Sequence, residues 1–590
     1  MILINHVGFL CNARKRFIVK DSSAKEFEIQ DMGRNSVEAL RGRENWIAVY
    51  KGALEIKSTP MGDFLTGDFS SISAPGVYRV VLPETDEKSY QFVITDGAYS
   101  RIPRMLLDFV HERRSGDFEN DWRMKSHLDD GVRSDTGEHL DAIGGWYDAG
   151  DLRKWMTHAT QPAIGFIDFY ERLSPAWNHF ADENVSPNDL ITETIWGVRF
   201  ILKMQEKSTG MFFEDVGGGG NSRAGEGLSW WYENHSGCYA DNAMNYFTDN
   251  ISGTQDDRIV RTTYNPIVQY VNQYILLRAA DHIRKYDPSL AERSLQTVKD
   301  NFSYVESIRA TDPMHGWTSV RSWRLLTGIE LCKKGIITET IASKYAEDLL
   351  SLYDDSIGYW FNDESKSRPY RGLIHSAQPL IALCTFCSAF PQNALNYRIL
   401  ALINDVITRY VTPMLQTNPF GIMPYGLYAK AETPNDLYRP FAGNLLFRFF
   451  MPDHSAQKVN HGLSAHWTSW AHALALASKI TGDDSLADAA FDQLYWLIGG
   501  NPLDASLISG IGYNNPMPHS RFHGTIPGGI CTGPRGDEHD EVVIDFDRNA
   551  EWSTVEYWNL PAANMMMALS VLIPQHIASD RKLGYVSHHQ

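Results

Sequence analysis

The feature that most constrains the fold is a change of hydrophobic pattern near residue 100 of the 590-residue chain. Before this point lie short segments rich in β-branched and aromatic residues, separated by turn signals such as Ala74-Pro75-Gly76. Segments of this kind favour β-strands, which we predict at 16–19, 26–29, 46–50, 77–82 and 90–94. Residues 1–97 are therefore predicted to form a small all-β sandwich.

After the change, apolar residues recur at the spacing of an α-helix. Ile191, Ile195, Val198 and Leu202 would lie on one face of a single helix. Further helical stripes occupy 267–278, 467–477 and 562–573. No low-complexity linker divides this part, so we predict a mainly α domain over 98–590, built from roughly a dozen helices. A chain of this length is also too long for one ordinary core.

The overall composition excludes some classes of function. The formal net charge of −18 argues against a nucleic-acid partner, because phosphate binding needs clustered Lys and Arg. No run approaches the ~20 apolar residues of a membrane span. The start, Met1-Ile-Leu-Ile, lacks the basic and apolar regions of a signal peptide, so with Met1 as the true start we expect a cytoplasmic protein. The oligomeric state is not indicated.

The six cysteines are scattered, as is common in a reducing compartment. Two of them form a Cys384-x-x-Cys387 pair inside an apolar run, with no second pair nearby. Zinc or redox use is one interpretation of this pair, and two buried core thiols is the favoured one. We therefore expect neither a metal nor a cofactor.

Two acids lie three residues apart in Gly144-Gly-Trp-Tyr-Asp148-Ala-Gly-Asp151. The small residues between Asp148 and Asp151 leave both carboxylates uncovered, so a tight loop could aim them at one spot. A hydrolase that inverts an anomeric centre needs a carboxylate that takes a proton from water and holds that water in place. The structural alternative is that either acid caps a helix beginning near Leu152.

Two further clusters hold candidate polar groups. His519 and Arg521 follow a Pro-rich loop, where they could donate hydrogen bonds into a cleft or simply form a surface loop held by a salt bridge. Glu556 lies in the otherwise apolar run 555–558. Apolar neighbours disfavour the ionised form of a carboxyl group, which suits a general acid. A carboxylate that caps the last helix is the alternative.

In this order, the three clusters resemble the signatures of glycoside hydrolase family 9, an inverting, cellulase-like family. The first signature matches Gly145-Trp-Tyr-Asp-Ala-Gly-Asp151 residue for residue. The middle signature resembles Ser506-x-Ile-Ser509 followed by Pro518-His-x-Arg521, with one residue fewer before the proline, and the last resembles Asp547-x4-Trp-x3-Glu556. Ile4-Asn-His-Val-Gly-Phe-Leu10 is similar to the start of the immunoglobulin-like domain of many members.

The resemblance implies a fold and a set of roles. The fold would be an immunoglobulin-like sandwich followed by an (α/α)6 barrel. Asp151 would be the general base, Asp148 its partner in holding the water, and Glu556 the general acid, with Glu551 as a competitor for that last role. The residues implied to bind substrate are His519, Arg521 and Tyr147.

The chain departs from the family beside the acid, because Trp558 and Ala562 stand where a small residue and an asparagine are expected. A cytoplasmic member would meet short β-1,4-linked oligosaccharides. The similarity to bacterial cytoplasmic exo-β-D-glucosaminidases predicts the release of glucosamine from such substrates. The alternatives are a β-glucosidase or endoglucanase on β-1,4-glucans and an inactive sugar-binding protein. The loop 214–232 would close one end of the cleft, or is an ordinary surface loop.

Overall fold

The computed structural model covers residues 1–590. It describes all of them except 34–45, 122–123, 151, 174–184, 218–247, 255–256, 434–437, 452–460, 518–525, 545–551 and 583–590.

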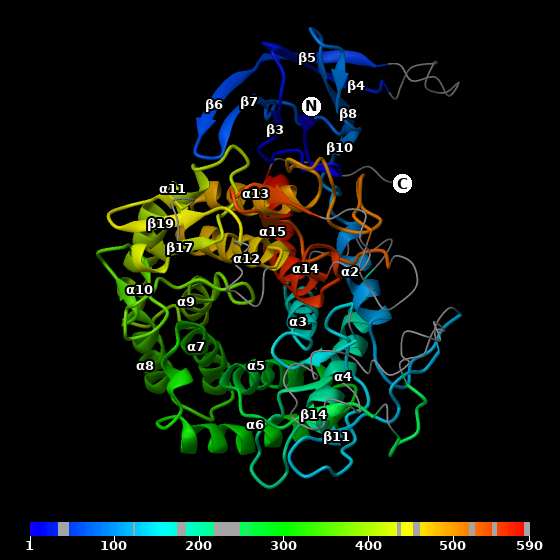
Figure 1. Cartoon of the computed structure of the whole chain (residues 1–590), viewed down its shortest axis with the longest axis vertical. Helices are drawn as coiled ribbons and strands as arrows, with labels where there is room; N and C mark the ends of the chain where they lie inside the picture. The colour runs from blue at the N-terminus through cyan, green and yellow to red at the C-terminus, as the bar shows by residue number, and fades with distance from the viewer. Residues whose placement is uncertain are drawn as a thin grey trace.

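The N-terminal strands form two facing sheets (Figure 1). The first runs in the order β1 (Ile2–Leu3), β3 (Arg16–Val19), β7 (Gly62–Asp68) and β6 (Glu55–Thr59). The second runs in the order β2 (Gly8–Phe9), β10 (Phe92–Ile94), β8 (Gly76–Leu82), β4 (Glu26–Asp31) and β5 (Ile47–Ala53), with β9 (Glu87–Lys88) beside β8. Buried phenylalanines fill the space between the sheets, for example Phe17 against Phe27 at 4.9 Å between ring centroids. Each predicted strand overlaps one of these elements.

The rest of the chain is a barrel of helices in two layers (Figure 1). In the described part of the chain, the inner ring consists of α3 (Pro162–Leu173), α5 (Pro266–Ile283), α7 (Thr318–Lys333), α9 (Gln378–Ala389), α12 (Ser464–Thr481) and α15 (Asn559–Lys582). Each packs on the next, and α15 closes the ring against α3. The outer helices are α2 (Arg101–Glu112), α4 (Pro187–Lys203), α6 (Pro288–Ile308), α8 (Glu339–Leu350), α10 (Asn396–Val406) and α13 (Asp484–Leu497). This arrangement is an (α/α)6 barrel, and the predicted sandwich followed by a mainly helical barrel is confirmed.

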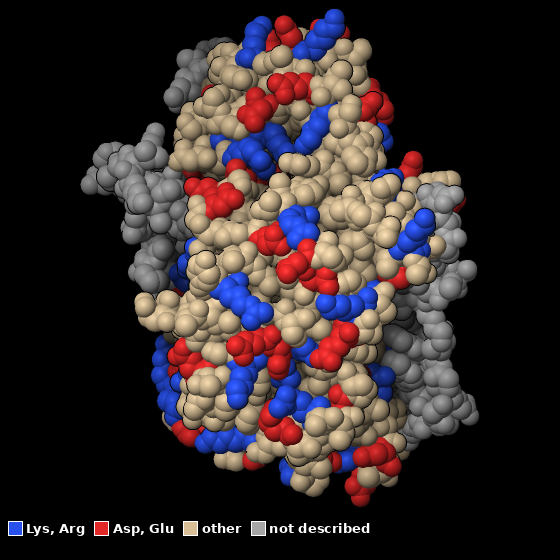
Figure 2. Space-filling view, turned by 90° about the vertical axis from the view of Figure 1, so that its left-hand side faces the viewer, with Lys and Arg blue, Asp and Glu red and all other residues tan. Residues whose placement is uncertain are grey.

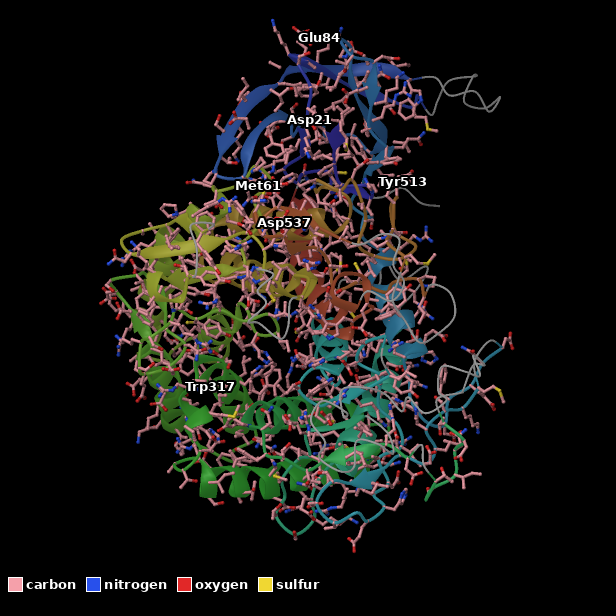
Figure 3. All side chains as sticks on the ribbon, viewed as in Figure 1. Asp21, Met61, Glu84, Trp317, Tyr513 and Asp537 are labelled. Carbon is pink, nitrogen blue, oxygen red and sulfur yellow. The ribbon has the colours of Figure 1, made fainter. Side chains whose placement is uncertain are left out.

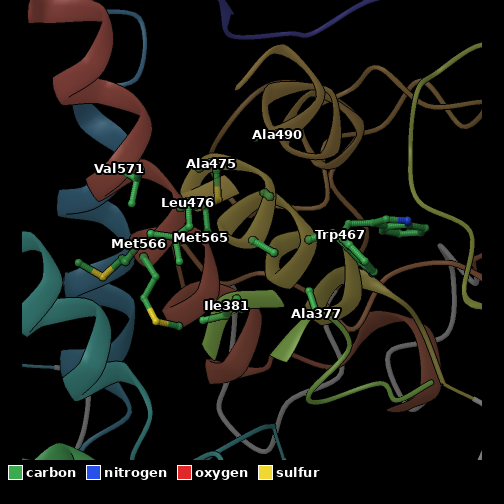
Figure 4. Close-up of a cluster of buried hydrophobic side chains, with 14 of the residues drawn as sticks. Ala377, Ile381, Trp467, Ala475, Leu476, Ala490, Met565, Met566 and Val571 are labelled. Atoms are coloured by element: carbon green, nitrogen blue, oxygen red, sulfur yellow. The ribbon is translucent and has the colours of Figure 1, made fainter. Parts of the chain in front are cut away.

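The sequence of each helix explains its layer. Nearly all side chains of α5 and α12 are buried, as a helix with neighbours on every side requires. Outer helix α6 buries one stripe, which includes Leu290, Ser294 and Val298. Outer helix α13 is buried on nearly all sides, because the sandwich covers its outer face. Figure 4 shows how Trp467 and Leu476 of α12 lie in the same buried cluster as Met566 of α15.

Short elements connect the helices. A four-stranded sheet has the order β11 (Val132–Arg133), β14 (Ile259–Arg261), β13 (Asp215–Gly217) and β12 (Lys154–Trp155). A second small sheet joins β17 (Gly426–Ala429), β19 (Leu445–Arg448) and β18 (Arg439–Pro440). The remaining strand pairs are β15 (Tyr353–Asp354) with β16 (Tyr359–Trp360) and β20 (Arg535–Gly536) with β21 (Val542–Val543). The short helical turns are η4 (Pro313–Gly316), η5 (Ile407–Val411), α11 (Thr412–Leu415), η6 (Lys430–Glu432) and α14 (Trp552–Val555).

The sandwich sits directly on the barrel. Phe9 of the sandwich packs edge-on against Tyr495 of α13, with ring centroids 5.2 Å apart. Tyr90 and Tyr513 stack at 4.0 Å, and Figure 3 labels Tyr513 at this junction. The predicted boundary at residues 97 and 98 falls between β10 and α2.

The described helices include none that combines the length and the apolar character needed to cross a membrane. On the face shown in Figure 2, acidic and basic side chains are interspersed rather than gathered by sign. Cys384 and Cys387 are buried, unbridged thiols on α9. Burial raises the pKa of Cys387 to about 11 and that of Cys384 further, which fits the interpretation as core thiols.

Candidate active site

The loops that precede the inner helices meet at one end of the barrel. Ala149, ahead of α3, forms a β-bridge with Trp558, ahead of α15. Ser376, ahead of α9, lies 2.9 Å from the Nδ1 of His466 at the start of α12. Ala465 of α12 packs in one buried cluster with Ala149 and Trp558, so the N-terminal ends of these four helices lie together. The segment carrying Asp148 adjoins the one carrying Glu556.

The first acidic motif is a tight loop with a fixed shape. Gly145 has a φ of 73°, and a Cβ at this position would lie 2.4 Å from the Phe200 ring, so only glycine fits. The loop closes where the amide of Asp148 donates to the carbonyl of Arg153 over 2.8 Å. Leu152 takes a left-handed φ of 66°, an unusual conformation for a bulky residue and one often found beside functional groups.

The carboxylate of Asp148 faces inward and is bound on both oxygens. Asp148 is 3% exposed. Its Oδ2 lies 3.1 Å from Nε2 of His158, and its Oδ1 accepts a long hydrogen bond of 3.4 Å from the amide of Trp155. The described residues around Leu152 form no helix, because the chain continues as β12 and turns until α3 begins at Pro162. The interpretation of Asp148 as a cap of such a helix is therefore wrong. Asp151 lies outside the described residues.

A buried cluster of charged side chains supports the loop that carries Asp148. Both side-chain oxygens of Asp130 accept from Arg258, at 2.8 and 2.6 Å, and Lys154 contacts the same carboxylate at 2.6 Å. Burial alone would raise the pKa of Asp130, but Arg258 and Lys154 outweigh burial and lower it well below its usual range. Arg258 also donates to the carbonyl of Leu152, and Lys154 to that of Ala142 at 2.7 Å. The cluster thus holds the main chain on both sides of the acidic motif.

Tyr147 belongs to this support rather than to a sugar-binding surface. It is 0% exposed, and its hydroxyl lies 2.5 Å from Nδ1 of His127 and 2.7 Å from Oγ of Ser126. The guanidinium of Arg258 lies over its ring at 5.6 Å. The predicted role of Tyr147 as a substrate ligand does not fit this geometry, because its hydroxyl is enclosed by protein.

Glu556 comes from an extended segment just before α15 and is also buried, at 7% exposure. Its carbonyl accepts from the amide of Thr532 at 2.8 Å, and the next residue, Tyr557, is paired with Cys531. The amide of Asn559 then donates to the carbonyl of Asp148 at 2.8 Å. Main-chain hydrogen bonds therefore set the spacing between the two acidic segments. Glu551, the competitor for the acid role, lies outside the described residues.

The segment of the middle signature, which contains Ser509, contacts the segment that carries Glu556. The hydroxyl of Tyr557 lies 3.1 Å from Oγ of Ser509 and accepts from the amide of Ile526 at 3.0 Å. His519 and Arg521 lie outside the described residues, so their predicted contacts with substrate stay predictions.

The structure adds residues that the sequence did not single out. His158 contacts Asp148, and His461 lies against Trp558 with ring centroids 4.9 Å apart. Burial lowers the pKa of His461 to about 4, so this imidazole is neutral near pH 7.

The family follows from comparison with known sequences. A model of glycosyl hydrolase family 9 matches residues 99–526. This chain belongs to that family. The match includes the loop of Asp148 and ends before Glu556.

Individual relatives in this family are similar over part of the chain. A cellodextrinase of Butyrivibrio fibrisolvens is 30% identical over 222 residues, which cover 35% of this chain and 38% of the relative. A xyloglucan-specific endo-beta-1,4-glucanase, BoGH9A, of Bacteroides ovatus is 25% identical over 233 residues, covering 35% and 37%. The chain thus matches less than half the length of these curated relatives.

Solved structures resemble the whole chain. A metagenome-derived glycoside hydrolase family 9 endoglucanase superposes with a TM-score of 0.68 at 16% identity, covering 97% of this chain and 99% of that one. A family 9 protein of Bacteroides ovatus gives a TM-score of 0.65 at 17% identity, covering 98% and 99%. The sandwich and the barrel therefore form a shared fold.

Proposed function

We propose that this protein is an inverting glycosidase that hydrolyses short β-1,4-linked oligosaccharides. One observation carries the proposal: the segments of Asp148 and Glu556 are joined by the Ala149–Trp558 bridge and by the hydrogen bond from Asn559. Two buried carboxylates from distant parts of the sequence are thereby held at one end of the barrel. Membership of glycosyl hydrolase family 9 supports the same chemistry.

In the proposed mechanism, Glu556 donates a proton to the glycosidic oxygen as the bond to the anomeric carbon breaks. Asp151 accepts a proton from a water molecule that attacks the opposite face of the sugar, and Asp148 orients that water. An inverting pair needs room for this water, with carboxyl groups roughly 6.5–9.5 Å apart. The product of a β-linked substrate is then the α-anomer.

The wall beside the acid favours a short substrate. The indole of Trp558 is buried in a small cluster with Ala149, Ala465 and Leu560, where the family pattern has a small side chain. A tryptophan here occupies volume that a small side chain would leave empty, and we infer that it shortens the space open to a glucan chain. This supports action on oligosaccharides, as the name of the Butyrivibrio fibrisolvens cellodextrinase also does.

For the sugar unit, we propose glucose ahead of glucosamine. A glucosamine unit carries an ammonium group, and recognising it calls for a carboxylate beside the C2 nitrogen. The names of two relatives, a cellodextrinase and an endo-beta-1,4-glucanase, favour glucose. Two buried acids around the site are already paired, Asp130 with Arg258 and Lys154, and Asp215 with Arg153 and Arg261. Neither offers a free charge. The exo-β-D-glucosaminidase specificity expected from the sequence is the second candidate, and the cytoplasmic location stays a prediction that cell fractionation tests.

Side-by-side hydrolysis of cellobiose, cellotetraose, chitosan disaccharide and N-acetylated chitobiose tests the proposal. We expect the highest kcat/KM on a glucose oligosaccharide, with α-anomer appearing first by proton NMR. A kcat/KM for chitosan disaccharide above that for cellobiose would instead establish the glucosaminidase. β-Anomer as the first product contradicts the inverting mechanism, and a rapid fall in carboxymethylcellulose viscosity contradicts the short substrate.

A further inference from the structure

His158 is in direct contact with one of the candidate catalytic acids. Its Nε2 lies 3.1 Å from Oδ2 of Asp148, and both residues are buried, at 7% and 3% exposure. His158 lies between β12 and α3, outside the three signatures described above.

The neighbours of His158 define which ring nitrogen carries hydrogen. A carboxylate oxygen can only accept, so Nε2 must donate to Asp148. The other ring nitrogen, Nδ1, lies 2.9 Å from Oγ1 of Thr157. In the neutral ring Nδ1 then accepts from the threonine hydroxyl. A relay of hydrogen bonds therefore runs from Thr157 through His158 to Asp148.

Aromatic rings keep the imidazole in place. Trp558 meets His158 edge-on, with ring centroids 5.5 Å apart, and the ring of Trp155 lies nearly parallel to it at 6.2 Å. Two more imidazoles, of His375 and His461, lie within electrostatic reach. Burial, reinforced by His158, lowers their pKa values to about 3 and about 4, so both are uncharged around neutral pH.

We propose that His158 is a positioning residue that orients the carboxylate of Asp148 toward the nucleophilic water. The inference rests on the proposed hydrolytic function and deepens it. With Oδ2 fixed by His158 and Oδ1 held loosely by the amide of Trp155, the carboxylate plane cannot rotate freely. The remaining lone pairs then point in a constant direction, which is what an acid that orients a water requires.

Two substitutions separate the hydrogen bond from the bulk of the ring. His158→Phe keeps an aromatic ring but removes the donor, whereas His158→Gln keeps an N–H donor at a similar reach. A hydrogen bond to a charged group typically contributes enough for about a 10- to 100-fold effect, so we expect kcat of His158→Phe to fall by that factor. KM should change little, because Asp148 acts on water and not on the sugar. His158→Gln should recover most of the lost kcat.

His472 supplies a matched control. It is another buried histidine, in the middle of α12, and its charged neighbours Asp168, Arg172 and Arg278 belong to other helices. His472→Phe should leave kcat unchanged. Equal kcat for wild type and His158→Phe overturns the proposal, as does a loss in His158→Gln as large as that in His158→Phe.

A second measurement does not depend on activity. Nitrogen NMR of the full chain labelled in histidine reports which ring nitrogen of His158 carries hydrogen, with His158→Gln used for assignment. Hydrogen on Nε2 that is perturbed in Asp148→Ala supports the contact. Hydrogen on Nδ1 alone overturns it. If the wild-type protein hydrolyses no β-1,4-linked oligosaccharide, the hydrolase proposal fails, and this spectrum still decides whether His158 donates to Asp148.

Discussion

At the residue scale, the acid role can be assigned by comparing two glutamates. Glu556 is buried beside the loop of Asp148, and replacing it with Gln removes the proton while keeping the shape. We expect Glu556→Gln to lower kcat on cellobiose by ~10²–10⁴-fold, the usual contribution of a general acid. Glu551→Gln is the matched control and should have a far smaller effect. A greater loss in Glu551→Gln would transfer the acid role to Glu551.

A second residue-scale prediction concerns the length of the substrate. Trp558→Gly should open the wall beside Glu556, because the indole fills a cluster with Ala149 and Leu560. We expect the ratio of kcat/KM for cellotetraose to that for cellobiose to rise by about 10-fold or more, the scale of one altered contact in a pocket. Trp317→Gly, which removes an exposed indole, serves for comparison. An unchanged ratio in Trp558→Gly would show that this side chain does not limit substrate length.

The role of some residues could be predicted from the sequence, and the role of others could not. Asp148 and Glu556 could be proposed from the sequence because they lie in motifs whose spacing resembles the family signatures, and hydrolysis needs carboxyl groups. The burial of Tyr147 could not, because its partners Ser126 and His127 precede it by about 20 residues and approach only in the fold. His158 carries no motif of its own, and only the turn that follows β12 brings it to Asp148.

At the scale of elements, a group of ion pairs links α3 to α5. Glu171 contacts Arg278 and lies 2.8 Å from His282. The side chain of Glu171 is 38% exposed, and the partial burial that would raise its pKa is outweighed by Arg278 and His282, which lower the pKa to about 2 from the ordinary 4.5. Because the folded pKa is depressed, the stabilisation is complete above pH 4.5 and is lost as pH falls toward about 2.

We therefore predict that the Tm of Glu171→Gln depends less steeply on pH in the acid range than the Tm of the wild type. Thermal unfolding followed by circular dichroism between pH 5 and pH 2 should show Tm of the wild type falling more steeply than Tm of the variant. Glu347→Gln, on the exposed face of α8, is the control and should follow the wild type. Parallel curves for wild type and Glu171→Gln would contradict the assignment.

Strands and helices could be predicted from the sequence where one face is buried, because burial leaves a regular pattern of apolar residues. The strand over 16–19 coincides with β3, and the stripe from Ile191 to Leu202 lies within α4. The neighbouring strands β6 and β7 were missed because most of their side chains are exposed or half-buried, which leaves little apolar alternation to detect.

At the scale of the whole molecule, burial on all sides marks inner helices such as α5 and α12, although the sandwich also buries outer helix α13. The closure of the ring does not follow from any such pattern. The contact of α15 with α3 joins segments about 400 residues apart, and no local pattern encodes such a pairing. Closure is nevertheless what creates the candidate site, because it brings Trp558 onto Ala149. The family resemblance, and not periodicity, supplied that part of the prediction.

The last prediction concerns how the sandwich and barrel unfold. Arg14 and Arg16 of the sandwich contact one oxygen of Asp492 on α13, at 2.5 and 2.6 Å, and Phe9 packs on Tyr495 beside them. Because the buried core runs continuously across this junction, we expect one calorimetric transition for the wild type.

Asp492→Asn tests this coupling. It removes the charge that both arginines face, but burial raises the pKa of Asp492 and so opposes its ionised form, and the arginines stay partly solvated, so the loss should be about 1 kcal/mol. The loss should lower Tm and separate a sandwich transition from that of the barrel. Lys51→Gln, which breaks an exposed contact with Glu28 within the sandwich, should preserve the single transition. Two transitions already present in the wild type, and unmoved in Asp492→Asn, would show that the sandwich folds independently and that the junction contributes no cooperativity.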